Sequence, residues 1–204
     1  MVLSILRRKQ PPDPYLCKPI ITDRFNIVNC TRKEAIKVTS PWRKDTEILH
    51  NLMMRQADYS VVEWVRVVGK PDGHARFFHA IVSKELKGTI GVHRTTIDGS
   101  GTASLAIVIH ARSWWGKGVF EEVRTGILDH FSASDRVVRF AGQVLSRNVS
   151  SIYNYNKMGF RMTGYDRMAW LSPVTGEHCD TVHYEMLAQD WRDKRAEQAG
   201  SNEH

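Results

Sequence analysis

The chain has 204 residues, of which 42% are hydrophobic and 25% are charged, so it holds enough apolar material to bury the core of one ordinary domain. Lysine and arginine number 29 against 22 for aspartate and glutamate, which gives a formal net charge of +7. This balance favours acidic partners such as nucleic acid, an anionic membrane or a phosphorylated cofactor. A solvated basic surface without a dedicated partner would have the same balance.

Cysteine usage and the apolar runs argue against two classes of protein. Cys17, Cys30 and Cys179 are far apart and form no CxxC pair, which argues against a disulfide framework. No apolar run is long enough to span a bilayer. In the opening "MVLSILRRK" the basic residues follow the apolar ones, which is the reverse of a secretion signal. We therefore expect a cytoplasmic protein without a membrane partner.

The first half of the chain alternates strand and helix signals after a proline-rich start. The prolines of "KQPPDP" forbid regular strand pairing, so residues 1–17 are interpreted as an N-terminal extension. "IITDRFNIVNC" predicts a strand, and the capping boxes Thr31/Glu34 and Ser60/Glu63 predict two helix starts. Three further strands are predicted at residues 76–83, 88–97 and 102–111.

The second half repeats the alternation. Apolar residues recur every four positions from Val119 to Phe131 and predict a helix. "RVVRFAGQVLS" predicts a strand, "SSIYNYNKM" a short helix that ends at Gly159, and two last strands flank the turn "VTGE". We expect an α/β domain with a mixed sheet over residues 18–191, followed by a polar, frayed C-terminal tail over residues 192–204.

A glycine-flanked loop precedes the long helix. Gly116 and Gly118 fit neither the GxxxxGK[ST] loop nor the GxGxxG dinucleotide pattern. What remains is a strand, a GxG loop and a helix, in which close backbone approach and the first free helix amides can hold a phosphate or pyrophosphate. A tight turn between strand and helix explains the loop equally well.

A second motif, "NVSSIYNYNKMGF", follows the next strand. Together the two motifs resemble the GNAT superfamily of acetyl-CoA-dependent N-acetyltransferases, whose patterns are [QR]-x-x-G-x-[GA] and N-x-x-[SA]-x-x-x-Y-x-K-x-G-F. The matching residues are Gly116, Gly118, Asn148, Ser151, Tyr155, Lys157, Gly159 and Phe160. "ITDRFNI", "WWGKG" and "DTVHYEMLAQDW" resemble the subgroup that acetylates protein N-termini, including those of ribosomal proteins.

The chain departs from the family pattern at three positions. Ser113 stands where the loop pattern has Gln or Arg, which puts pyrophosphate binding in doubt. Ser104 stands where a glutamate is common on the fourth strand, so a common general-base position is lost. Ala106 stands where a glycine is frequent.

The resemblance implies a GNAT fold: a mixed, mostly antiparallel central sheet flanked by helices, with splayed fourth and fifth strands and acetyl-CoA bound between them. It implies that backbone groups of the fourth strand line the pantetheine arm and polarise the carbonyl, that loop amides hold the pyrophosphate, and that the second motif contacts the cofactor. The implied cofactor-binding residues are Ile107, Val108, Ile109, Trp115, Gly116, Lys117, Gly118, Val119, Phe120, Asn148, Ser151 and Lys157.

Acetyl transfer to an amine needs a proton donor for the departing thiolate and an acceptor for the amine proton. Within the resemblance, Tyr155 is the predicted general acid, with a core tyrosine as the alternative. The base stays open between Glu122, His110 and a water chain near Ser104. The side chains of "HCDTVH" alternate between strand faces, so no metal site is predicted.

The sequence thus predicts an enzyme that moves acetyl from acetyl-CoA to a primary amine, with a protein N-terminus as the predicted acceptor. Acetylation of a small amine or antibiotic is the first alternative. A GNAT-like module that binds acyl-CoA or nucleic acid without turnover is the second, and Trp42, Trp64, Trp114 and Trp115 would supply base stacking in that case. Whether the protein forms a homodimer stays open.

Overall fold

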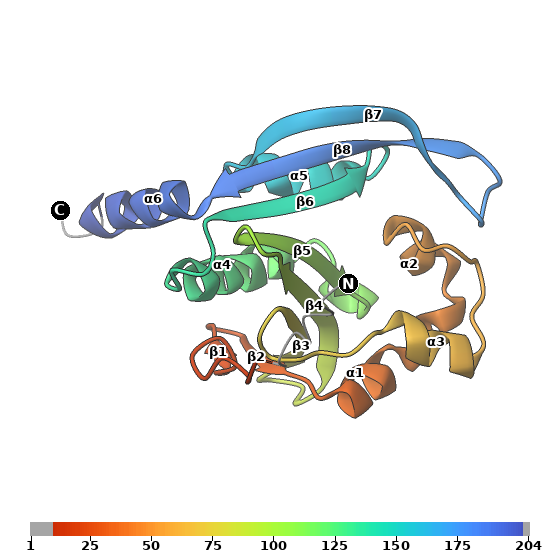
Figure 1. The fold of residues 1–204 in the computed structure, drawn as a ribbon, viewed down its shortest axis with the longest axis horizontal. Coiled ribbons are helices and arrows are strands. Elements are labelled where there is room, and N and C mark those ends of the chain that lie inside the picture. The colour runs from red at the N-terminus through yellow and green to blue at the C-terminus, as the bar shows by residue number, and fades with distance from the viewer. Residues whose placement is uncertain (1–9, 202–204) are drawn as a thin grey trace, which may run out of the picture.

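The computed structural model describes residues 10–201, which form one eight-stranded sheet with helices on both faces (Figure 1). The spatial order of the strands is β1-β2-β3-β4-β5-β6-β8-β7, and every neighbouring pair is antiparallel except β5 and β6. The strands are β1 (Ile20–Ile21), β2 (Phe25–Asn29), β3 (Arg76–Ser83), β4 (Thr89–Ile97), β5 (Thr102–Ile109), β6 (Arg139–Leu145), β7 (Arg161–Leu171) and β8 (His178–Leu187).

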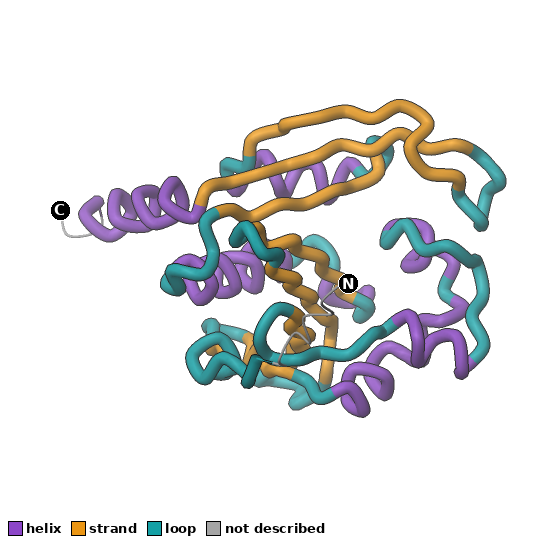
Figure 2. The backbone as a smooth tube through the Cα atoms, viewed as in Figure 1, coloured by secondary structure: helices purple, strands orange, loops and turns teal. Residues whose placement is uncertain are grey.

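The helices fall into three groups along the sheet. Those between β2 and β3 gather beside one end of the molecule, α4 and α5 flank the middle, and α6 projects from the opposite end (Figures 1 and 2). Their bounds are α1 (Arg32–Thr39), η1 (Ser40–Lys44), α2 (Thr46–Asn51), α3 (Val61–Val67), η2 (Arg112–Trp114), α4 (Val119–Ser132), α5 (Val149–Met158) and α6 (Ala188–Ser201). Within residues 10–201, none of these helices has the length and hydrophobicity that a membrane crossing requires.

The core forms where α4 packs on the sheet. Val119, Val123, Ile127 and Phe131 are all buried, which confirms the predicted four-residue stripe. Both predicted capping boxes are also present, because Thr31 and Ser60 each accept a hydrogen bond from the backbone amide three residues later, and the glutamate there accepts one in return. Short-range sequence signals therefore fixed these helix starts.

The predicted divergence in the sheet is confirmed. The predicted first strand is divided by a turn into β1 and β2, so the predicted fourth and fifth strands are β5 and β6 here. These two strands pair only where Thr102–Ser104 meets Arg139–Ala141. Beyond these residues the edge of β5 that faces β6 pairs with no other described strand, and β6, β8 and β7 turn away from β1–β5 (Figure 2).

Both ends of the described chain are more ordered than the sequence predicts. The polar tail was expected to be frayed, but it is helical in α6 as far as Ser201, because Trp191 is buried and donates a hydrogen bond to Asp129 on α4 at 2.8 Å. At the other end, residues 1–9 of the predicted extension lie outside the described residues, whereas Leu16 is buried.

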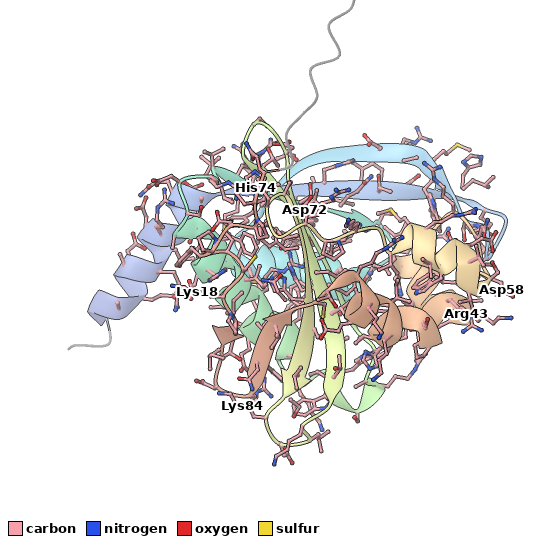
Figure 3. The ribbon with its side chains drawn as sticks, turned by 60° about the horizontal axis from the view of Figure 1, so that its bottom comes forward. Lys18, Arg43, Asp58, Asp72, His74 and Lys84 are labelled. Atoms are coloured by element: carbon pink, nitrogen blue, oxygen red, sulfur yellow. The ribbon has the colours of Figure 1, made fainter. Side chains whose placement is uncertain are left out.

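The described part of the N-terminal extension is fixed by a salt bridge and backbone bonds. Asp13 lies 2.9 Å from Arg136 and donates its backbone amide to Gly73. Figure 3 labels Asp72 and His74 in the same turn, and the His74 carbonyl accepts a bond from Arg136 at 2.7 Å. The extension is thus attached to the turn that leads into β3.

Candidate active site

A cleft of about 1200 Å³ opens where β5 and β6 diverge. It is lined by β4, β5, the glycine loop and α4 on one side and by β6, α5, β7 and β8 on the other, with α2 at one end. Of the predicted site residues, the ones that line it are Ile107, Val108, Ile109, Trp115, Gly116, Gly118, Val119, Phe120, Asn148, Ser151, Tyr155 and Lys157. The structure therefore brings two motifs that are some 30 residues apart in the sequence to one site.

The glycine loop presents backbone rather than side chains to the cleft. Gly116 and Gly118 both have φ of +72°, a left-handed conformation that side chains disfavour. Gly118 is the N-cap of α4, and no side chain caps this helix, so its first amides stay free to bind an anion. The loop is held by Arg24, whose guanidinium donates to the Lys117 carbonyl at 3.0 Å. These features suit a phosphate or diphosphate group.

Of the two lysines predicted to bind the cofactor, Lys117 and Lys157, only Lys157 lines the cleft. Lys117 is outside the cleft lining, and its ammonium group lies 5.8 Å from the centre of the Trp114 ring. Lys157 lines the cleft, but its Nζ bonds to Glu121 at 2.6 Å, and this hydrogen bond raises the pKa of Lys157. The charge of Lys157 is thus already partly neutralised at the rim.

Asn148 both starts α5 and contacts α2. Its side-chain oxygen accepts the backbone amide of Ser151 at 3.0 Å, which makes it the N-cap of α5. Its side-chain nitrogen lies 3.4 Å from the Asn51 oxygen. Asn148 therefore sets the position of α5 in the cleft wall, and with it the position of Tyr155.

Tyr155 lies inside the cleft wall with only 3% of its surface exposed. Its ring stacks on Tyr184 of β8, with centroids 4.9 Å apart and planes 5° apart, and meets Phe160 edge to face. Its hydroxyl lies so close to the Cα of Gly142 on β6 that a Cβ there would overlap it. The packing therefore fixes the hydroxyl at the strand that borders the sheet gap.

The other face of the same strands carries a histidine that the sequence analysis considered only as a metal ligand. His183 directly precedes Tyr184 on β8. Because neighbouring side chains of a strand point to opposite faces, His183 points away from the face that carries Tyr184. Its Nε2 lies 2.8 Å from Asp166 and 3.5 Å from the Gln143 side chain, and it lines the cleft. Only the pairing of β6, β7 and β8 brings these groups together, so no local pattern could reveal them.

Of the candidate general bases from the sequence, Glu122 and His110 lie outside the cleft lining. Glu122 is outside the cleft lining and accepts bonds from the Thr22 hydroxyl at 2.6 Å and from the Arg24 amide and guanidinium at 2.8 and 2.6 Å. Burial raises the pKa of this carboxyl, but these bonds lower it by more, so the pKa lies below its usual value. Glu122 therefore ties α4 to the β1–β2 turn.

His110 and Ser104 are the other two residues considered for deprotonation of the amine. His110 packs against Trp42 at 5.0 Å, lies outside the cleft lining, and has its pKa lowered by burial. Ser104 is exposed and lines the cleft. Among residues 10–201, no group of three or more His, Cys, Asp or Glu side chains could hold a metal ion.

The end of the cleft next to α2 is enclosed by contacts between distant segments. His50 on α2 bonds through Nδ1 to the Ser172 hydroxyl at 2.9 Å, and its ring meets Trp170 edge to face. Figure 1 shows α2 beside the tip of the β7–β8 hairpin. With the Asn51–Asn148 contact, these interactions join α2 to the wall formed by β6, α5, β7 and β8.

Comparison with known proteins agrees with this geometry. A family model described as an acetyltransferase (GNAT) domain matches residues 24–161. The sequence matches none of the curated proteins with which it was compared. Among solved structures, spermidine N-acetyltransferase from Vibrio cholerae, in complex with CoA and spermine, is similar with a TM-score of 0.71 and 16% identity, over 82% of this chain and 98% of that one.

Two ribosomal-protein acetyltransferases are also similar. The ribosomal L7/L12 alpha-N-protein acetyltransferase RimL in complex with coenzyme A has a TM-score of 0.70 and 14% identity, over 85% of this chain and 99% of that one. The ribosomal-protein-S5-alanine acetyltransferase from Vibrio fischeri has a TM-score of 0.68 and 13% identity, over 85% and 98%. At these identities the likeness concerns the fold. Since the family model covers most of the sheet and both motifs, the chain belongs to the GNAT acetyltransferases, enzymes that use acetyl-CoA as cosubstrate.

Proposed function

We propose that this protein transfers acetyl from acetyl-CoA to the free N-terminal amine of a polypeptide. The observation that carries the proposal is the placement of two proton-transfer groups on opposite faces of one sheet gap. Tyr155 lies against β6 on the face covered by α5, and His183, held by Asp166, lies on the other face. A donor and an acceptor of protons on opposite faces of the sheet beside the gap suit two reactants that enter from opposite faces.

The free edge of β5 supports binding of the cosubstrate. Its backbone groups beyond Ser104 have no strand partner on the side of β6, so they can bond to the amides of an extended pantetheine arm. The loop at Gly116 and Gly118 would then hold the diphosphate at the start of α4. Asn148 and Ser151 are proposed to line the same arm from the opposite wall.

In the proposed mechanism, His183 takes the proton of the attacking amine on the side of α2 and the β7–β8 hairpin. Backbone amides of β5 polarise the thioester carbonyl, so that negative charge developing on its oxygen is stabilised. The Tyr155 hydroxyl gives its proton to the departing thiolate, since a tyrosine keeps this proton at neutral pH. The nitrogen–carbon bond forms as the carbon–sulfur bond breaks.

The charges on the acceptor side favour a peptide over a polyamine. Glu185 lies between Arg139 and Arg161, at 3.2 and 2.6 Å, which lowers the pKa of its carboxyl and neutralises its charge. Glu47 is paired with Arg112 at 2.6 Å. Arg94 lines the cleft and has no acidic partner among residues 10–201. A polycation would meet few free carboxylates here, whereas peptide carbonyls and acidic side chains would find donors.

The test is release of CoA thiol from acetyl-CoA with a panel of amines. We expect turnover with peptides that have a free N-terminus, and little with the same peptides blocked at the N-terminus but containing lysine. Spermidine and spermine serve as the polyamine arm. Higher kcat/KM on a polyamine than on every peptide would assign a small-amine acetyltransferase. Saturable CoA binding without turnover on any amine would assign a binding module and contradict the proposal.

A further inference from the structure

Arg124 is a buried cation in the wall of the cleft, and it has no ion-pair partner among residues 10–201. It belongs to the second turn of α4, lines the cleft, and retains only 1% of its surface. Its Nε and Nη1 atoms donate no hydrogen bond, and no carboxylate within residues 10–201 pairs with it. An unpaired buried charge is costly, and an arginine keeps its charge in proteins. An anion that enters the cleft could compensate this charge.

In the part of the chain that the structure describes, aromatic rings and a neutral histidine surround Arg124. Its guanidinium carbon lies 4.9 Å from the centre of the Phe120 ring and 5.5 Å from that of Tyr155. On the sheet below, burial and then the charge of Arg124 hold the pKa of His93 well below its usual value, so His93 is neutral. The Nε2 atom of His93 is also buried without a hydrogen-bond partner. Two side chains thus offer unused polar atoms in the same region.

The position of Arg124 separates it from the diphosphate loop. Gly118 opens α4 six residues earlier, which places the two Cα atoms roughly 9 Å apart along the helix axis. The guanidinium instead lies between the rings of Phe120 and Tyr155, and Tyr155 is the group that we place at the thioester. An enclosed position beside the thioester suits a small anion at the end of the acyl chain better than a diphosphate.

We propose that the cleft also takes acyl-CoA donors whose short acyl chain ends in a carboxylate, and that Arg124 binds this carboxylate. The inference rests on the proposed transferase function and adds a class of donor to it. The reaction is the same acyl transfer: the amine nitrogen bonds to the thioester carbon, the carbon–sulfur bond breaks, and the thiolate receives a proton. The product amide keeps the terminal carboxylate, and no oxidant or reductant is needed.

The first experiment uses the wild-type protein and a panel of donors. Thiol release and product mass are measured with acetyl-, malonyl-, succinyl-, glutaryl- and butyryl-CoA on the best amine acceptor. We expect at least one dicarboxylic acyl donor to be used with higher kcat/KM than butyryl-CoA, which has as many acyl carbons as succinyl-CoA and no carboxylate. Transfer of acetyl without transfer from any dicarboxylic donor would overturn this inference and leave the proposed function standing. Transfer from none of the donors would contradict both.

The second experiment changes the cation. Arg124→Met should lower the ratio of kcat/KM for the preferred dicarboxylic donor to that for acetyl-CoA by roughly 10- to 100-fold, the loss expected for a charge-assisted hydrogen bond. Arg124→Lys should retain part of the ratio, because it keeps the charge and loses the two-pronged geometry. Arg94→Met is the matched control: this arginine lines the same cleft but is exposed on the other sheet face, so any loss of acceptor binding should lower the rates with both donors alike and leave the ratio unchanged.

Binding of free CoA tests whether Arg124 binds a phosphate of the cosubstrate instead of the carboxylate of the acyl chain. If Arg124 bound a phosphate of the cosubstrate, Arg124→Met would weaken CoA and succinyl-CoA equally in a calorimetric titration, and the inference would be overturned. We expect a larger loss for succinyl-CoA than for CoA. Circular dichroism of each variant verifies its fold, and the wild-type donor panel decides the question if Arg124→Met does not fold.

Discussion

The hydroxyl of Tyr155 occupies the space that a side chain at position 142 would fill, so Gly142 and Tyr155 form one unit of the cleft wall. A glycine within a strand often marks a close approach of another group. Here it lets a buried tyrosine place its oxygen against β6 at the sheet gap. The geometry of the proposed proton donor therefore depends on the absence of a Cβ atom on the neighbouring strand.

Tyr155→Phe should remove the proton donor and leave the ring packing intact. We expect kcat to fall about 10²- to 10⁴-fold, the usual contribution of general acid catalysis, while the Kd for acetyl-CoA changes little. Steady-state thiol release and calorimetry measure the two quantities. Tyr153→Phe is the control, since Tyr153 is exposed on the same helix and should retain most of the activity. Equal kcat in Tyr155→Phe and wild type would remove Tyr155 from the mechanism.

Gly142→Ala should displace Tyr155. Because the new Cβ would overlap the hydroxyl and the ring, we expect a loss of about 1–3 kcal/mol in the free energy of unfolding and a fall in kcat. In the Tyr155→Phe background the same change should lower kcat little further, since the hydroxyl is already absent. Gly88→Ala is the control, because its Cβ would have no neighbour closer than 3.7 Å and the residue lies outside the cleft lining. Additive kcat losses in the double variant would argue against the coupling.

His183→Asn should impair deprotonation of the amine. We expect kcat/KM for the amine to fall about 10²- to 10⁴-fold and the Kd for CoA to stay near its wild-type value. Asp166→Asn should have a smaller effect in the same direction, because Asp166 only orients the ring. His178→Asn on the same strand is the control, since His178 lies outside the cleft lining and bonds to the Met168 carbonyl. An unchanged rate in His183→Asn would leave the base elsewhere.

Glu122 should contribute stability with a defined pH dependence. Its folded-state pKa is depressed, so its contribution is fully present above the usual range of glutamate, about pH 4 to 5, and is lost as pH falls through the folded pKa. Glu122→Gln should therefore destabilise the protein by about 1–2 kcal/mol at pH 7, and by less near pH 3, as measured by urea unfolding.

The same variant tests whether Glu122 is the base. Because Glu122 bonds to Thr22 and Arg24 outside the cleft lining, we expect kcat of the folded variant to stay within tenfold of the wild type. A loss of several hundredfold would restore Glu122 as a candidate base. Glu121→Gln is the control for stability, since its pair with Lys157 is solvent-exposed and such pairs contribute little.

Gly118→Ala should weaken binding of the cosubstrate. The residue has φ of +72°, and a side chain there costs about 1–2 kcal/mol or shifts the loop that presents the amides of α4. We expect the Kd for CoA to rise roughly tenfold in calorimetry. Gly176→Ala, at the same φ in the β7–β8 turn, should cost similar stability without changing the Kd. Equal Kd in both variants would place the diphosphate away from this loop.

Most of the sheet and the helix starts could be predicted, because they depend on neighbours in sequence. The boxes at Thr31 and Ser60 need only the residue three positions on, and the stripe of α4 repeats every four. The two motifs fixed the loop and α5 in the same way. Tyr155 and the gap between β5 and β6 were expected only because the two motifs resemble those of the GNAT family.

The rest of the site depends on pairing across the sheet, which no local pattern specifies. His183 reaches Asp166 only through the register of β7 and β8, and Gly142 meets Tyr155 only because α5 packs on β6. The charge of Arg124 predicts an exposed helix position, but Arg124 is buried because α4 packs against β5 and α5. The one sequence signal for the contact with Tyr155 was Gly142, a glycine inside a predicted strand.

The C-terminal helix has a mechanical consequence for the enzyme. Since β5 and β6 share only a short parallel segment, the angle between the two halves of the sheet is also set by α6, which bonds to α4 through Trp191 and Arg195 at Asp129 and through Arg192 at the Ser132 carbonyl. These contacts between α6 and α4 hold the two parts of the sheet at a fixed angle, far from the reacting groups. Truncation of the chain before Trp191, or fusion of a bulky partner there, would let the angle between β1–β5 and β6–β8–β7 change. Turnover would then be altered although no residue of the cleft is substituted.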